Sequence, residues 1–207
     1  MENRKIPQEI ENPVDNVLIK ISEFLSPYFK KINFTANGIT TLSLISGLFS
    51  FCLYVNKSYT ASAILFLLQY FFDCMDGYYA RRYKITSQFG DYYDHLKDLL
   101  IILLFGYAIL SKYLQLNTAE KYLPFIIIIF LLISEIHLGC QEIYYNKDSK
   151  ETADMLKMAR YFCPYEDKKD LYNFMTISRF AGTGTLTLFT VFLILYSYVV
   201  DKHLSAQ

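Results

Sequence analysis

Residues 73–98, DCMDGYYARRYKITSQFGDYYDHLKD, decide how this chain is organised. Four aspartates stand here at helical spacing, Asp73 and Asp76 before a basic turn and Asp94 and Asp98 after it. Residues three and four positions apart share one face of a helix, so each pair lines one helix face. The flanking segments, ASAILFLLQYFF and LLIILLFGYAIL, are strongly apolar. Carboxylates at the ends of membrane helices are costly and mark function.

Four converging carboxylates require a compensating cation, because like charges brought together destabilise a fold. Hard oxygen ligands without cysteine or an obligatory histidine indicate Mg²⁺ or Mn²⁺ rather than zinc. A pair of such ions suits displacement at phosphorus, where one ion polarises the phosphoryl group and both offset charge on the leaving oxygen. The residues alone therefore predict a metal-dependent phosphoryl transfer at a membrane surface.

The spacing D-x2-DG-x2-AR-x8-G-x3-D-x3-D is complete between Asp73 and Asp98. It resembles the signature of the CDP-alcohol phosphatidyltransferase family, whose members are also called CDP-alcohol phosphotransferases. The resemblance directly covers about residues 33–100 and, more loosely, the helical layout after them. It implies a bundle of membrane helices and a reaction that transfers a CDP-linked group to an alcohol and releases CMP.

The resemblance also implies roles for single residues. Two ions would bind four carboxylates, those of Asp73, Asp76, Asp94 and Asp98. Asp98 would also be the catalytic base for the attacking hydroxyl. The CDP part of the donor would be accommodated by Gly77, Ala80, Arg81 and Gly90. Glycine lets a nucleotide approach the backbone closely, and a guanidinium offers planar donors suited to a diphosphate. Without the motif, helix packing would be the preferred explanation of the glycines.

Four other polar residues have two interpretations each. Asn37 either contacts the nucleotide or caps the first span. His95 is similar to the Asp-His pair of the choline and ethanolamine phosphotransferase branch, and either helps to activate the hydroxyl or forms hydrogen bonds on the back of its helix. Glu135 and His137 lie inside an apolar segment, where they either bind the acceptor alcohol or hold the bundle together.

The 207 residues are 53% hydrophobic and carry no net charge, which allows one domain and gives no electrostatic reason to expect a nucleic-acid partner. We expect an all-α, polytopic transmembrane helix bundle of five to six spans, in contact with membrane lipids. Apolar segments lie at about 38–55, 60–79, 90–111, 122–145 and 172–200. The last is long for one crossing and short for two.

Two features of that last segment stay open. Its Gly182-Thr183-Gly184 is either a break or a close-packing site. Ser178 and Arg179, at its start, either reach the active-site cavity or lie at the membrane interface.

Both ends of the chain differ from the membrane domain predicted at 33–200. Residues 1–12 are charged, which predicts a solvated tail rather than a signal peptide, and 201–207 form a short C-terminal tail. Residues 13–32 combine helically spaced apolar residues with lysines, which predicts an interfacial amphipathic helix interrupted near Pro27. Residues 146–170 predict a water-exposed loop with a short helix at 152–162.

The cysteines leave the redox compartment undetermined, whereas the basic residues indicate the orientation in the membrane. Cys52, Cys74, Cys140 and Cys163 have no metal-binding spacing, and we expect buried, inert thiols. With the motif loop in the cytosol, fourteen Lys and Arg residues lie on that side and four on the other, as the positive-inside rule requires. We therefore expect a multi-pass integral membrane protein whose active site faces the cytosol. The family resemblance adds a homodimer as an expectation.

The substrates are less defined than the reaction. The resemblance to the family around ARR and Gly-Asp-x2-Asp-His-x2-Asp favours a CDP-choline or CDP-ethanolamine donor and diacylglycerol as acceptor. The alternative is CDP-diacylglycerol with serine, inositol or glycerol phosphate, where a phosphorylated acceptor would need a basic pocket from Arg82, Lys84 and Arg179. A cation transporter would place its carboxylates along a pore rather than at one membrane face. An inactive scaffold is disfavoured by the intact motif.

Overall fold

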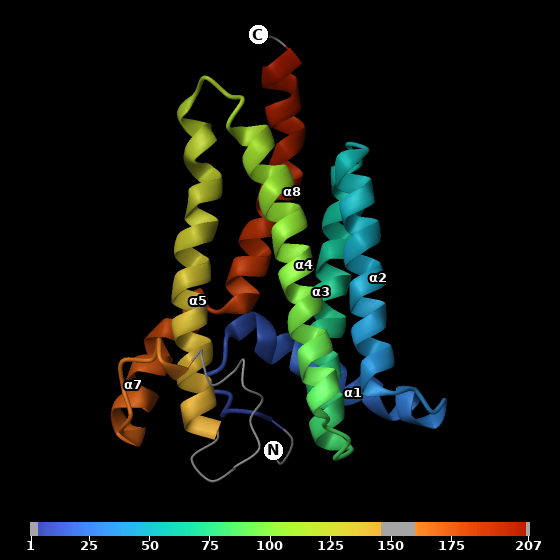
Figure 1. Ribbon diagram of the computed structural model, residues 1–207, viewed down its shortest axis with the longest axis vertical. Coiled ribbons are helices and arrows are strands. Elements are labelled where there is room, and N and C mark those ends of the chain that lie inside the picture. The colour runs from blue at the N-terminus through green and yellow to red at the C-terminus, as the bar shows by residue number, and fades with distance from the viewer. Residues whose placement is uncertain (1–3, 146–159, 206–207) are drawn as a thin grey trace.

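The computed structural model describes residues 4–145 and 160–205, and every regular element within these ranges is a helix. The long helices run along the long axis of the molecule: α2 (Ala36–Val55), α3 (Tyr59–Arg82), α4 (Gln88–Tyr113), α5 (Leu123–Tyr145) and α8 (Thr183–Ser205) (Figure 1). The C-terminus lies at one end of this bundle and the N-terminus at the other. The all-α class is confirmed for the described residues. The short helix expected at 152–162 lies mostly outside them.

Two shorter α-helices lie at the N-terminal end of the bundle. α1 (Pro13–Lys31) crosses the long helices there, and α7 (Lys168–Ser178) lies at the same end (Figure 1). The 3-10 helices η1 (Ala119–Tyr122) and η3 (Arg179–Ala181) lead into α5 and α8. Three segments of the described chain are long and apolar enough to cross a membrane: Ala36–Val55, Ala119–Tyr145 and Lys168–Ser205.

Small side chains bring α2 close to α3 and α4. The Ser43 hydroxyl of α2 donates a hydrogen bond to the backbone carbonyl of Gln69 in α3 (2.9 Å). Gly47 faces α4, where an added Cβ atom would lie 2.6 Å from Cδ1 of Ile101. Small residues permit such close approach between membrane helices. Helix α2 therefore fixes the positions of the two helices that carry the motif aspartates.

The long apolar stretch near the C-terminus contains both a break and a close contact. Gly182, with φ −72° and ψ −179°, follows η3 and separates α7 from α8. Gly184 packs against the start of α1, because a Cβ atom there would lie 2.5 Å from Oδ1 of both Asn12 and Asp15. Gly182 therefore marks the break in this segment, and Gly184 is its close-packing site.

The N-terminal residues are not the solvated tail that their charges predicted. Among the described residues, Ile6 and Ile10 are buried in a cluster with residues of α5 and α7. Asn12 is fully buried, and its side-chain amide donates to the backbone carbonyl of Arg179 (2.6 Å). The prediction was wrong because the partners of this segment lie near the other end of the sequence.

Helix α1 also continues through Pro27, where an interruption was expected. Proline has no N–H, so the carbonyl of Glu23, four residues earlier, loses its usual helical donor. Arg82 replaces that donor: Nη1 lies 2.7 Å from the Glu23 carbonyl oxygen and 2.7 Å from Oγ of Ser26. The carbonyl that the proline leaves without a helical donor therefore accepts a short hydrogen bond from an arginine at the end of α3 and a longer one from the Ser26 hydroxyl (3.4 Å).

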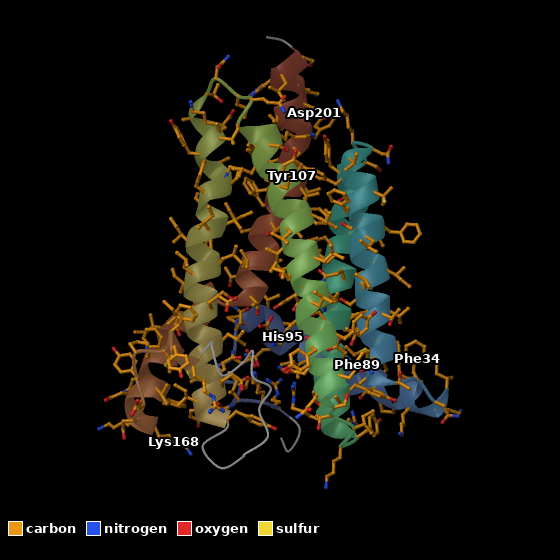
Figure 2. All side chains as sticks on the ribbon, in the orientation of Figure 1. Phe34, Phe89, His95, Tyr107, Lys168 and Asp201 are labelled. Atoms are coloured by element: carbon orange, nitrogen blue, oxygen red, sulfur yellow. A yellow bond between two sulfur atoms is a disulfide. The ribbon has the colours of Figure 1, made fainter. Side chains whose placement is uncertain are left out.

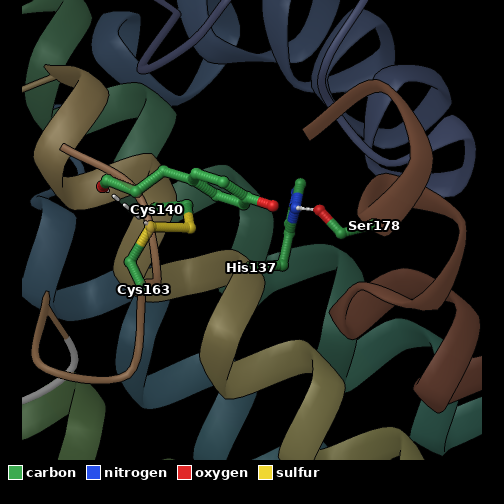
Figure 3. The surroundings of a disulfide bond; sticks show 5 residues. His137, Cys140, Cys163 and Ser178 are labelled. Atoms are coloured by element: carbon green, nitrogen blue, oxygen red, sulfur yellow. Dashed lines mark hydrogen bonds between the residues drawn. A yellow bond between two sulfur atoms is a disulfide. The ribbon is translucent and has the colours of Figure 1, made fainter. Parts of the chain in front are cut away.

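Two cysteines form a disulfide, which corrects the expectation of inert thiols. Cys140 of α5 is bonded to Cys163, 23 residues later (Figure 3). Cys52 and Cys74 are free, the first exposed and the second half-buried. Spacing gave no sign of the pairing, because the bond joins a helix to a residue 23 positions later in the sequence.

Candidate active site

Three of the motif aspartates lie together between α3 and α4. One carboxylate oxygen each from Asp73, Asp94 and Asp98 lies within 4.8 Å of the other two. Helix α4 presents its two aspartates after a start fixed by Ser87, whose hydroxyl accepts the backbone N–H of Gly90 (3.0 Å). Several carboxylate oxygens at this separation form a donor set that suits a hard divalent cation.

The ammonium group of Lys97 lies inside this cluster. Nζ is 2.8 Å from Oδ1 of Asp94 and 2.9 Å from Oδ1 of Asp98, and it also contacts Oδ1 of Asp73. The side chain of Lys97 is fully buried. Sequence reasoning missed this residue, although two signals were present: it follows Asp94 by three positions on one helix face, and a lysine inside an apolar helix is costly.

Asp76 stands apart from this group of three. It is 5% exposed, and its Oδ2 has no hydrogen-bond partner among the described residues. A buried carboxylate oxygen without a partner is costly. A cation bound beside Asp76 would remove that cost, so the residues fit the divalent ions that the motif implies.

A polar cavity of about 140 Å³ opens beside Asp76 and Asp94. It joins the start of α2, the end of α3 and the start of α4. All five residues predicted to contact the nucleotide line it: Asn37, Gly77, Ala80, Arg81 and Gly90. The structure therefore brings these five residues together, although Asn37 and Gly90 are 53 positions apart in the sequence.

The glycines make room in this polar cavity. A Cβ atom at Gly77 would lie 3.2 Å from Nη1 of Arg81, which folds back over it, and one at Gly90 would lie 2.8 Å from Oδ1 of Asn37. Thr35 is the residue that caps α2, because its hydroxyl accepts a backbone N–H of the first turn. The capping interpretation of Asn37 is therefore wrong, and nucleotide contact stays a prediction.

An apolar cavity of about 260 Å³ begins on the other side of the carboxylates. Asp73 and Asp98 line it together with Tyr70 and Thr183. The remaining lining is mostly aliphatic and aromatic and comes from α3, α4, α5 and α8, for example Phe66, Phe105, Leu110, Pro124 and Leu186. The carboxylates therefore lie between a polar cavity on one side and an apolar cavity on the other.

The other predicted helpers lie elsewhere. His137 is buried, and its Nδ1 is 2.8 Å from Oγ of Ser178 (Figure 3). Glu135 is exposed, and Arg179 donates to the backbone carbonyl of Glu9 (2.5 Å). None of these residues lines either of the two cavities described above.

His95 is likewise not part of either cavity lining. It is half-buried on α4, in the half of the molecule that contains the N-terminus, whereas Asp201 lies at the opposite end (Figure 2). Its position next to Asp94 in sequence does not bring it into the lining, because adjacent helical residues point in different directions.

The described helices thus hold clustered carboxylates between a polar and an apolar cavity. The family model for CDP-alcohol phosphatidyltransferase matches residues 33–202, so the chain belongs to this family of transferases of substituted phosphate groups. The family is membrane-integral and generally depends on divalent metals. No curated protein and no solved structure matches the chain.

Proposed function

We propose that the protein transfers a phospho-alcohol group from CDP-choline or CDP-ethanolamine to diacylglycerol and releases CMP. The observation that carries this proposal is the position of the aspartates between the two cavities. The polar cavity, with Arg81 and Gly77, suits a nucleoside diphosphate. The apolar cavity, which Asp98 lines, suits the acyl chains of a lipid alcohol. A water-soluble donor and a lipid acceptor fit this division.

In this mechanism two divalent ions, Mg²⁺ or Mn²⁺, would be held by Asp73, Asp76, Asp94 and Asp98 and would supply charge compensation at the diphosphate. Arg81 donates hydrogen bonds to the same diphosphate. Asp98 accepts the proton of the lipid hydroxyl as its oxygen attacks the phosphorus that carries the alcohol. A new P–O bond forms, and the bond to the bridging oxygen breaks, so that CMP leaves with that oxygen.

We also propose that α3 and α4 cross the membrane beside the three apolar segments, which gives five spans. With 24 and 26 residues, they are about 36 and 39 Å long, enough for a bilayer core. Helix α1 then lies at the interface, and the polar cavity faces the cytosol. Residues 33–200 are the catalytic membrane domain in this proposal, and a homodimer stays an expectation from the family.

The alternative reaction, in which CDP-diacylglycerol is the donor and a polar alcohol is the acceptor, has less support. A phosphorylated acceptor such as glycerol phosphate needs basic groups near the carboxylates. Of the three residues predicted to supply them, none lines either cavity, and Arg179 is engaged with the backbone of Glu9. A cation transporter has no support from the family to which the chain belongs.

To test this proposal, the purified protein is reconstituted in liposomes and given CDP-choline, CDP-ethanolamine or CDP-diacylglycerol. The released CMP and the lipid product are then measured. We expect CMP release from one of the first two donors, only when diacylglycerol is present. Asp98→Asn should abolish it, whereas the matched change Glu135→Gln, on a carboxyl outside both cavities, should not. Turnover of CDP-diacylglycerol with a polar alcohol would contradict the proposed substrates.

A further inference from the structure

Lys97 holds a place that the proposed mechanism gives to an ion. Its ammonium contacts Oδ1 of each of the three clustered aspartates, Asp73, Asp94 and Asp98, and it reaches Asp94 and Asp98 at 2.8 and 2.9 Å. A divalent ion held by these oxygens would sit among them at about 2.1 Å for Mg²⁺. An ammonium group and an ion cannot both occupy that space.

The remaining carboxylate is not engaged in this way. The contacts of Lys97 are with three aspartates, and Asp76 is not one of them. Oδ2 of Asp76 is buried without a partner among the described residues, on the side of the polar cavity. The two halves of the carboxylate set are therefore unequal: one is filled by a positive charge of the protein, and the other presents an unpartnered oxygen.

We propose that Lys97 is an internal competitor for one of the two ion positions. Its ammonium fills the position among Asp73, Asp94 and Asp98 until an ion displaces it, whereas the position beside Asp76 is open to an ion directly. The inference rests on the proposed role of the four aspartates as ion ligands. It makes one ion tightly bound and the other weakly bound, and it explains how the aspartates stay together without an ion, since the ammonium offsets their repulsion.

The experiment titrates the purified, metal-free protein with Mn²⁺ and measures free Mn²⁺ by electron paramagnetic resonance, without nucleotide. Wild type should show one tight and one weak site. Lys97→Met keeps the aliphatic stem and removes the charge, so the weak site should bind Mn²⁺ at least about tenfold more tightly. Lys112→Met is the matched control, because Lys112 pairs with Asp201 at the other end of α4. It should bind Mn²⁺ like wild type.

Thermal unfolding gives a second measurement. Without ions, Lys97→Met loses its counter-charge and should melt at a lower temperature than wild type, and Mn²⁺ should raise its melting temperature by more. Lys97→Gln serves if the methionine variant does not fold, and two equally tight sites in wild type would by themselves overturn the inference. Unchanged or weaker Mn²⁺ binding in the variants would overturn it while leaving the proposed function intact. A lack of saturable binding in every protein would overturn both.

Discussion

Gly90 of α4 keeps the polar cavity open beside Asn37. A Cβ atom there would lie 2.8 Å from Oδ1 of Asn37 and 3.1 Å from Oγ of Ser87, so Gly90→Ala must displace the amide or the helix cap. We expect the KM for the CDP donor to rise about tenfold, which corresponds to about 1.4 kcal/mol. Initial rates at varied donor concentration measure this effect, and the KM for the lipid acceptor should stay close to that of wild type.

Gly106 offers the matched change further along the same helix. It lines the apolar cavity, and a Cβ atom there would meet nothing within 4 Å. Gly106→Leu should therefore fit, fill part of that cavity and raise the KM for the lipid acceptor, with little effect on the donor. A rise in the donor KM for both variants would contradict the division of the substrates between the two cavities.

The carboxyl group of Asp15 gives the fold a dependence on pH. It is buried where α1 meets α3 and α8, and it accepts a hydrogen bond from the Tyr70 hydroxyl (2.6 Å). Burial, and then the charge of Glu11, raise the pKa of Asp15 from 3.8 to about 7. Between pH 3.8 and about pH 7, the Asp15 carboxyl binds its proton more tightly in the folded protein than in the unfolded chain. Stability from this group is therefore full at low pH and is lost as the pH rises through about 7.

Asp15→Asn should remove this dependence. We expect the melting temperature of wild type to fall between about pH 5 and about pH 8, and that of Asp15→Asn to fall less. Differential scanning calorimetry in detergent measures both. Asn keeps an oxygen that accepts the Tyr70 hydroxyl, so packing is largely preserved. Equal changes in the two proteins would mean that Asp15 does not set the dependence.

At the scale of elements, α1 is joined to α3 through the carbonyl that Pro27 leaves without a helical donor. Arg82→Met removes the guanidinium that binds the Glu23 carbonyl oxygen at 2.7 Å. We expect the free energy of unfolding to fall by about 0.5–1.5 kcal/mol, the usual net contribution of one hydrogen bond, because the Glu23 carbonyl is exposed to water and also accepts the Ser26 hydroxyl (3.4 Å). Thermal unfolding in detergent, with reversibility checked, gives the comparison.

A second substitution separates this effect from a general loss of surface charge. Pro27→Ala restores a backbone N–H for the Glu23 carbonyl, so Arg82→Met should cost less in that background. The non-additivity of the two changes measures the coupling between the proline and the arginine. Strict additivity would show that Arg82 stabilises α1 in some way other than through the Glu23 carbonyl.

At the scale of the whole molecule, the sequence predicted what depends on local spacing. Helical periodicity predicted that the aspartates lie on two helix faces, and the resemblance of one short motif to a family predicted Gly77, Ala80, Arg81 and Gly90 as nucleotide contacts. The features that were missed depend on contacts between distant segments. They are the burial of Asn12 against Arg179, the disulfide of Cys140 with Cys163, and the apolar cavity shared by four helices. Lys97 is the exception, since its spacing from Asp94 was visible.

The side of the membrane on which the polar cavity lies is also a property of the whole molecule, and two observations oppose each other. The basic residues place the motif loop in the cytosol, fourteen against four. The disulfide-bonded Cys140 packs against Ile6 and Ile10 of the N-terminal segment, and the N-terminus lies at the same end of the bundle as the turn between α3 and α4, although disulfides are rare in the cytosol. If the basic residues determine the orientation in the membrane, the two cysteines are reduced in the cell, and the disulfide forms only under oxidising conditions.

Labelling with a membrane-impermeant maleimide decides between the two sides. A variant with Cys52, Cys74 and Cys140 changed to serine leaves Cys163 as the one thiol. We expect Cys163 to remain unlabelled in intact cells and to be labelled once the cells are permeabilised. The reason is that fourteen positively charged residues on one side of the membrane have more influence on topology than a single disulfide. Lys57→Cys, exposed at the opposite end and placed in a cysteine-free chain, should show the reverse. Labelling of Cys163 in intact cells would place the polar cavity outside the cytosol, and the nucleotide donor would then have to be supplied there.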